Sequence, residues 1–457
     1  MQHHDSKNKL GMRESLMLLV GGMIGSAIYS LSGLTMYYAG PAVIITWTIA
    51  AAVLLMYGLQ VAELAVRFPR SGGVYAFPRA AFADDGTQRG VILGWFSSWG
   101  YIFANIGAIA FAAIYVGTYL GAGFNIEGDW QIPLALIACL IVLGLNILKI
   151  TITGKANTVL VTGLIVTMLI YVIVGLTSGE WNPANFQPFF TQGHLGATGF
   201  IQAIPNAMVA YGSIVAIAFM VSEVKDPNRT VPKTALYAMI IVVVLYLLCI
   251  ITTLGLVTTQ FLIDHPGMRF IPFYAAVFTT LQEHMWLAKV ISISAVLALI
   301  TTMLVVTQLT ARTIAVAAQD GLLPKILGRY NKKTGTPIAA SVVVIALSMI
   351  VSCFPHFTEQ IVNLASLFAA ITLVITMASL IVARKRFGSE GLAYRAKGGR
   401  WLPWLTILLI GATYIPGIIQ GGWQLWAYTL GLYAIGALIL WIAMKRHRIG
   451  SSAAEGK

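Results

Sequence analysis

The chain has 457 residues, of which 58% are hydrophobic and 10% are charged. Soluble domains average about 25% charged residues, so this composition excludes both a disordered chain and a soluble enzyme with a single anchor. The hydrophobic residues number about 265, close to what twelve bilayer spans of roughly 20 to 25 residues would use. We therefore expect a multi-pass membrane protein.

Twelve apolar ranges, separated by charged or Pro/Gly-containing segments, predict the membrane helices. In chain order they are 12–34, 41–66, 90–121, 131–148, 155–177, 198–222, 233–258, 286–316, 337–354, 360–384, 401–420 and 424–444. The sequence thus predicts an all-α membrane protein with short tails at residues 1–11 and 445–457. No cleavable signal is expected, because the first tail is polar and the first apolar range is long enough to stay in the membrane.

The positions of the basic residues predict the orientation. With the N-terminus in the cytoplasm, 27 of the 29 Lys and Arg residues fall on the cytoplasmic side, and the exceptions are Arg269 and Lys289. Basic residues concentrate in cytoplasmic loops, so both termini are expected in the cytoplasm and the chain in the inner cell membrane. The net charge of +13 then reflects topology, with anionic lipid headgroups rather than nucleic acid as its partners.

Residue patterns that support catalysis are not found. The three cysteines, Cys139, Cys249 and Cys353, have no paired spacing, and the seven histidines have no metal-ligand spacing. The sequence contains neither a G-x-S-x-G element nor a Walker-type loop. An enzyme and a self-contained ATP-driven pump are therefore disfavoured, and no cofactor is expected.

A cluster of glycines interrupts the first apolar range. Gly21, Gly22 and Gly25 lie within the stretch Val20–Tyr29, and each glycine weakens a helix by about 1 kcal/mol relative to alanine. Unwinding there would expose amide groups at the start of the next half-helix, where an anion such as a carboxylate binds. The alternative is a G-x-x-x-G packing face formed by Gly21 and Gly25.

A second glycine-containing break occurs in the sixth apolar range, at Ala210-Tyr211-Gly212-Ser213, after Pro205. Interrupted spans at corresponding positions of two halves are typical of transporter binding sites. The ranges 12–177 and 198–384 would then be inverted repeats, and residues 401–444 would add two further helices. No clear residue-level repeat relates the two halves.

Four motifs, in chain order, resemble those of the amino acid–polyamine–organocation transporter family. Its elements G-S-G-I-F, F-P-x-S-G-G-x-Y and E-x-x-[ND]-P-x-[KR]-x-[IV]-P are similar to Ile24–Tyr29, Phe68–Tyr75 and Glu223–Pro232. Its D-G-x-L-P and T-G-T-P pair is similar to Asp320–Pro324 and Thr334–Pro337. The resemblance implies a leucine-transporter-type core of five plus five inverted helices, with helices one and six broken.

The resemblance also implies a binding site. The amides of Ser26, Ala27 and Ile28 would hold a substrate carboxylate, and carbonyls near Ile24 and the second break would meet its amino group. Asn105 and Tyr211, with Ser366 or Phe368, would surround the substrate side chain, although Asn105 could instead make an interhelical hydrogen bond. The full set of implied substrate contacts is Ile24, Gly25, Ser26, Ala27, Ile28, Asn105, Ala210, Tyr211, Gly212 and Ser213.

Two departures from the family pattern bear on the substrate. Ala27 replaces the second glycine of G-S-G, which adds a methyl group where the backbone would approach the substrate. Val215 falls where some basic amino acid and amine antiporters have glutamate, and no acid precedes Glu223 in the sixth range. A neutral zwitterionic amino acid is therefore expected, and a polyamine or basic amino acid is the alternative.

The coupling ion is not predicted by the sequence. Sodium-coupled relatives of this fold use two hydroxyls on helix eight, for which Thr301 and Thr302, or Ser292 and Ser294, are candidates. Such hydroxyls also commonly bond the carbonyl one turn back in their own helix. Residues 156–176 contain no lysine of the kind that some proton-coupled relatives place in helix five. Proton symport and amino acid exchange stay open.

We therefore predict a secondary amino acid transporter that works by alternating access. A channel or a substrate-sensing receptor built on a transporter body is the alternative from another class, but repeated polar rings for a pore are not found, and the tails are too short for a sensor domain. Interfacial tryptophans at Trp401, Trp404, Trp423 and Trp426 would anchor helices eleven and twelve in lipid or support a homodimer, so both monomer and homodimer are considered.

Overall fold

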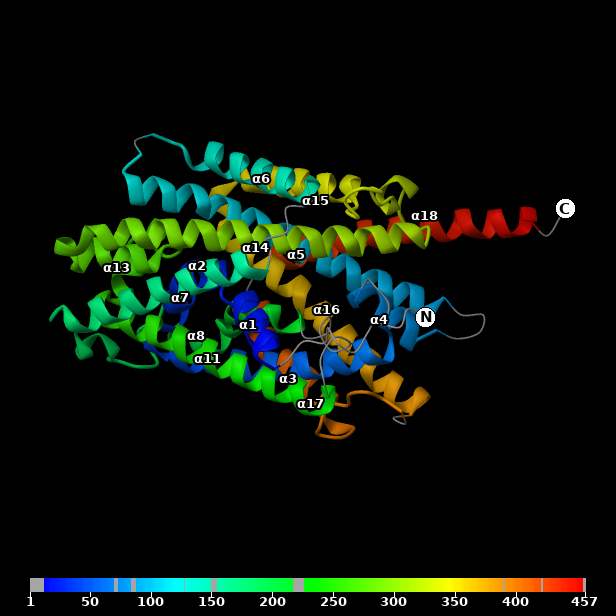
Figure 1. The fold of residues 1–457 in the computed structure, drawn as a ribbon, viewed down its shortest axis with the longest axis horizontal. Coiled ribbons are helices and arrows are strands. Elements are labelled where there is room, and N and C mark those ends of the chain that lie inside the picture. Colours follow the sequence, from blue (N-terminus) through cyan, green and yellow to red (C-terminus); the bar gives the residue numbers. More distant parts are fainter. Residues whose placement is uncertain are drawn as a thin grey trace.

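The computed structural model describes residues 12–69, 73–83, 88–126, 128–148, 154–216, 226–388, 391–420 and 422–454. Over these ranges the regular structure is helical, and β-strands do not occur in them (Figure 1). Eight helical stretches of the described chain are long and apolar enough to cross a membrane, and three shorter apolar helices accompany them. The predicted all-α membrane architecture is confirmed at this level.

The described residues of the first half contain seven α-helices, of which all but one lie within the predicted apolar ranges or extend them by a few residues. They are α1 (Met12–Met23), α2 (Ser26–Ala39), α3 (Val43–Arg67), α4 (Gly73–Ala81), α5 (Arg89–Phe124), α6 (Gln131–Ile147) and α7 (Gly154–Thr177). The first apolar range is divided between α1 and α2. Helix α4 was not among the predicted ranges, because nine residues are too few to cross a bilayer.

The second half begins with short elements and continues with long helices. They are α8 (Gly199–Gln202), α9 (Ile204–Tyr211), the 3₁₀ helix η5 (Gly212–Ala216), α11 (Pro227–Leu256), α12 (Thr259–Asp264), α13 (Pro272–Thr280), α14 (Met285–Gln319), α15 (Ile338–Ser352), α16 (Thr358–Phe387), α17 (Trp401–Gln420) and α18 (Gly422–Ala454). The last residues of the predicted sixth range, 217–222, and the motif residues 70–72 and 223–225 lie outside the described residues.

The long helices form an elongated bundle around α2, α5 and α14. All fourteen residues of α2 are buried, and α5 packs against α14, α16, α4 and α6. Helices α6 and α15 pair along one edge of the bundle (Figure 1). Apolar side chains such as Ile141, Ile173, Val244 and Leu438 are exposed on the outer helices, as expected for surfaces that contact lipid.

The two ends of the bundle carry different connecting elements. Helix α4 and the C-terminal part of α18 lie at one end, and α13 lies at the other (Figure 1). We call these the α4 end and the α13 end. The C-terminal end of α14 is at the α4 end, since Asp320 forms an ion pair with Arg79 of α4.

Candidate substrate site

The helix interrupted at Ile24 and Gly25 is the centre of the candidate site. The Ile24 N–H still donates to the Val20 carbonyl at 2.9 Å, but Gly25 has an extended backbone, with φ −142° and ψ −156°. Helix α2 then starts at Ser26, with no side-chain cap on its N-terminus. The first amides of a helix lack partners within it, and the helix dipole adds positive charge there. This N-terminus is suited to a carboxylate.

Helix α14 lies directly against the interruption. The Ser26 N–H donates to Thr302 Oγ1 at 3.2 Å, and Thr302 Oγ1 itself donates to the Ala298 carbonyl at 2.8 Å. A Cβ atom at Gly25 would lie 2.7 Å from Thr302 Oγ1, closer than van der Waals contact permits. Gly25 is thus required for this close approach of the two helices.

The other candidate sodium ligands differ in their hydrogen bonding. Thr301 Oγ1 donates to the Leu297 and Ala298 carbonyls of its own helix, each at 3.0 Å. Ser294 Oγ and Tyr29 OH are hydrogen-bonded at 2.6 Å. Ser292 Oγ is buried and has no hydrogen-bond partner among the described residues.

Tyrosines from other helices bond the backbone on both sides of the interruption. Tyr246 OH, from α11, donates to the Met23 carbonyl at the end of α1 at 2.7 Å. Tyr119 OH, from α5, donates to the Tyr29 carbonyl in α2 at 2.5 Å. The last carbonyls of a helix lack intrahelical donors, so the Tyr246 bond stabilises the end of α1, which would otherwise be costly inside a membrane. Neither tyrosine was predicted as a site residue, because each lies within an apolar span with no motif around it.

Tyr211 belongs to an aromatic cluster next to the interruption. Its ring meets Trp47 edge-to-face at 5.8 Å and lies 5.7 Å from the ring of Tyr246. The Tyr211 side chain is fully buried, and its hydroxyl has no hydrogen-bond partner within the described part of the chain. Because an unbonded buried hydroxyl costs about 1–3 kcal/mol, this group is suited to bonding a polar ligand.

The second predicted break lies beside the first. At Gly212 the chain changes from the α-helix α9 to the 3₁₀ helix η5. A Cβ atom at Gly22 would lie 3.7 Å from Ser213 Cβ, and Ala210 is buried at the end of α9. The structure therefore brings the Gly22–Gly25 segment and the Gly212–Ser213 segment together.

The remaining predicted contacts are placed differently. Asn105 lies on α5, and its buried Nδ2 atom has no acceptor among the described residues. Phe368 stacks on Tyr433 of α18 at 5.2 Å, so its ring faces α18. Ser366 Oγ donates to Asn206 Oδ1 at 3.0 Å. It therefore belongs to a separate series of hydrogen-bonded polar side chains, which we call the polar chain.

That polar chain runs from Ser366 toward the α13 end and was not predicted. Asn206 Nδ2 donates to Asn363 Oδ1, and Asn363 Nδ2 donates to Tyr38 OH, both at 3.3 Å. Tyr38 OH donates in turn to Glu359 Oε1. Residues 359, 363 and 366 follow helical spacing on α16, which is the signal that could have revealed their common face.

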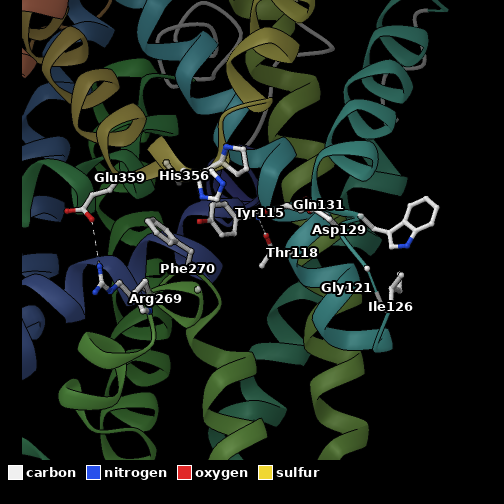
Figure 2. A pocket seen from close by; sticks show the side chains of 17 residues that line it. Tyr115, Thr118, Gly121, Ile126, Asp129, Gln131, Arg269, Phe270, His356 and Glu359 are labelled. Carbon is white, nitrogen blue, oxygen red and sulfur yellow. Dashed lines mark hydrogen bonds and ion pairs between the residues drawn. The ribbon is translucent and has the colours of Figure 1, made fainter.

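A cavity of about 510 Å³ opens beside Glu359, the last residue in this series of hydrogen-bonded side chains. Glu359 and Arg269 line one side, Tyr115 and Phe270 lie in the middle, and Asp129 lies on the other side (Figure 2). The Arg269–Glu359 ion pair has an N–O distance of 3.8 Å, and the Arg269 guanidinium lies over the ring of Tyr37. This cavity is at the α13 end, separate from the helix interruptions.

Comparison with known sequences agrees with this architecture. A family described as amino acid permease matches residues 10–448. The chain belongs to the amino acid permease family. The permease is thus a multi-pass membrane protein that transports amino acids, and the predicted family resemblance is confirmed. The family and the relatives below are transporters rather than enzymes.

The similar proteins include branched-chain amino acid permeases and cationic amino acid transporters. The permease is 26% identical over 460 residues to the branched-chain amino acid permease BcaP of Bacillus subtilis strain 168, covering 96% of this chain and 94% of that protein. It is 25% identical over 413 residues to BcaP of Lactococcus lactis, covering 83% of each. It is 26% identical over 430 residues to cationic amino acid transporter 7, chloroplastic, of Arabidopsis thaliana, covering 88% of this chain and 68% of that protein.

Proposed function

We propose that the permease carries neutral amino acids across the cell membrane by alternating access, with the substrate held at the paired interruptions. The observation that carries this proposal is the non-helical Ile24–Gly25 step between α1 and α2. Amides at the start of α2 suit a carboxylate, and carbonyls at the end of α1 suit an ammonium. A zwitterion is thus matched by backbone groups alone.

The proposed architecture has twelve crossings. Residues 12–177 and 198–384 form two inverted repeats of five helices, and α17 and α18 follow them. The α4 end faces the cytoplasm, because Lys and Arg concentrate in the connections there and in the C-terminal tail. Both termini are then cytoplasmic, and the α13 end faces outward from the inner membrane.

The charge distribution supports a neutral substrate over a basic one. Among the described residues Glu63 is the only buried acid, and Arg67 and Arg384 neutralise it. Recognition of a second cationic group would need a free acid near the site. Val215 stands on η5 where such an acid would be expected, and Tyr211 and Trp47 add aromatic surface. Branched-chain amino acids are therefore the first substrates to test.

We further propose that transport does not require sodium. Thr302 Oγ1 accepts the Ser26 N–H and donates to Ala298, so a sodium ion would have to displace an existing hydrogen bond. Proton symport and exchange of one amino acid for another are both compatible with this arrangement.

Leucine uptake into proteoliposomes tests the proposal. The wild-type permease is expected to exchange internal for external leucine at the same rate when choline replaces sodium. Gly25→Ala is expected to lower the rate at least about tenfold, because its methyl group would collide with Thr302 Oγ1. Gly431→Ala is the matched control, since a Cβ atom there meets no neighbour within 4 Å.

Two outcomes contradict the proposal. If Gly25→Ala transports as fast as Gly431→Ala, the interruption is not the substrate site. If the permease takes up arginine or putrescine and does not take up leucine, the proposed neutral substrate is wrong.

A further inference from the structure

A small groove opens between α3, α11 and the segment 391–400 that precedes α17. It has a volume of about 240 Å³. Its apolar wall is formed by Leu55 and Leu59 of α3 with Pro232 and Leu236 of α11, and the exposed residues Arg395 and Lys397 also line it. We propose that this groove binds an anionic phospholipid, with the headgroup phosphate between the two cations and an acyl chain along the leucines.

The cations are directed outward by the conformation of the segment. Tyr394 and Ala396 are buried, each 2% exposed, whereas Arg395 and Lys397 are exposed. Alternation of buried and exposed side chains places residues two apart on the same side. The Arg395 guanidinium and Lys397 ammonium form no ion pair with the residues that the structure describes. Two adjacent uncompensated cations are a suitable site for a phosphate.

The apolar wall favours a lipid over a free phosphate. Leu236 is 45% exposed, and on the same helix Tyr237, Ile240 and Ile241 are also exposed apolar side chains. On a membrane helix such side chains contact acyl chains. The groove therefore continues into the lipid-facing surface of α11. Basic pockets between membrane helices at the cytoplasmic side are suited to anionic headgroups.

The segment that carries the cations is joined to three helices. The Ala396 N–H donates to Glu63 Oε2 of α3 at 2.9 Å, and Arg384 Nη2 of α16 donates to the Ala396 carbonyl at 3.3 Å. The Arg395 N–H donates to Asn228 Oδ1 of α11 at 3.2 Å. A lipid bound to Arg395 and Lys397 would thus stabilise the segment that connects α3, α11 and α16.

Native mass spectrometry of the full-length permease tests the site. Delipidated protein is titrated with phosphatidylglycerol or with phosphatidylcholine of the same chains, and bound lipids are counted. We expect one tightly retained phosphatidylglycerol. Arg395→Gln/Lys397→Gln should bind it on the order of thirtyfold more weakly, since each basic residue near a membrane surface contributes about a factor of five. Lys332→Gln/Lys333→Gln, which removes two exposed charges elsewhere, should bind as wild type.

A groove-filling variant distinguishes binding of a whole lipid from binding of phosphate alone. Leu236→Trp keeps both cations and is tolerated at a half-exposed position, yet it should also lose the retained lipid. It also serves as the test if the double charge variant fails to fold. Equal retention of both lipids by the wild type, or wild-type retention by either groove variant, overturns the proposal. Displacement of phosphatidylglycerol by millimolar inorganic phosphate would instead make this a free-phosphate site and overturn the lipid assignment.

Discussion

The two ends of the bundle each contain a network built on one acid, and the networks differ in burial. At the α4 end Glu63 is fully buried, and its oxygens accept hydrogen bonds from Arg67, Arg384 and the Ala396 amide at 2.5–3.0 Å. At the α13 end Glu359 is 36% exposed and lies 3.8 Å from the Arg269 guanidinium. Tyr38 provides its one hydrogen bond among the described residues.

This difference suggests different roles in the proposed alternating access. Removing one partner from a buried, fully bonded charge group is costly, so α3, α16 and the 391–400 segment should stay together as one body. An ion pair with one partly exposed partner and an N–O distance of 3.8 Å contributes about 0–1 kcal/mol. In the proposed alternating access, the contact between Tyr38 of α2 and Glu359 of α16 depends on one hydrogen bond beside this ion pair, so it can open at lower cost than the buried network and admit substrate from the α13 end.

The largest effect is expected at the buried acid. Glu63→Gln leaves two arginines buried without a counter-charge, so it should destabilise the permease by about 3–5 kcal/mol. Thermal unfolding of the detergent-purified protein measures this as a clear fall in Tm. Arg384→Gln and the double variant Glu63→Gln/Arg384→Gln complete a double-mutant cycle. Additive effects of the two substitutions would show that the network is not cooperative.

Local signals in the sequence predicted the helices and the place of the interruption. Helix α5, Arg89–Phe124, nearly coincides with the predicted range 90–121, because a helix depends on contacts only four residues apart. The non-helical residues Ile24 and Gly25 fall within the glycine-containing stretch that was predicted to unwind. Whether this interruption binds substrate stays a prediction until Gly25→Ala is measured.

Local sequence signals did not predict which distant residues bond to these elements. Thr302 accepts the Ser26 N–H from 276 residues away, and Arg384 bonds Glu63 from 321 residues away. A single sequence shows residue types but not which helix faces pack together. Thr302 was considered as one candidate sodium ligand, with own-helix bonding as the alternative, and in the structure it bonds the Ala298 carbonyl one turn back and also accepts the first amide of α2.

A smaller effect is expected where α4 meets α14. Tyr75 is buried, and its hydroxyl donates to Asp320 Oδ2 at 2.6 Å, while Arg79 forms an ion pair with the same atom at 2.7 Å. Tyr75→Phe removes one hydrogen bond to a charged group but leaves the ion pair. We expect a loss of about 1–3 kcal/mol at pH 7, seen as a fall in Tm. Tyr428→Phe, at an exposed position, should change nothing.

The effect of Tyr75→Phe should depend on pH. Burial, and then Asp320, raise the pKa of Tyr75 well above its usual value. The folded state keeps the hydroxyl protonated, so its stabilisation is complete below the unfolded pKa of about 10 and declines as the pH rises further. The Tm difference between wild type and Tyr75→Phe should therefore shrink between pH 9 and pH 11. A constant difference over this range would mean that the hydroxyl is not held in its neutral form.

The smallest change in stability is expected at Glu359. Glu359→Gln removes the charge that pairs with Arg269 but keeps an oxygen that can accept from Tyr38, so the free energy of unfolding should fall by at most about 1 kcal/mol. A shift of that size still changes the ratio of open to closed α13 ends up to about fivefold.

Labelling of a Ser366→Cys reporter by a membrane-impermeant thiol reagent, in a Cys353→Ser background, measures this opening. Glu359→Gln should speed labelling severalfold, whereas Glu180→Gln, which removes another exposed acid, should not. If Glu359→Gln lowered Tm as much as Glu63→Gln and left labelling unchanged, the contacts at both ends would serve only to stabilise the fold. The proposed opening at the α13 end would then have to be abandoned, because its cost would equal that of breaking the buried network.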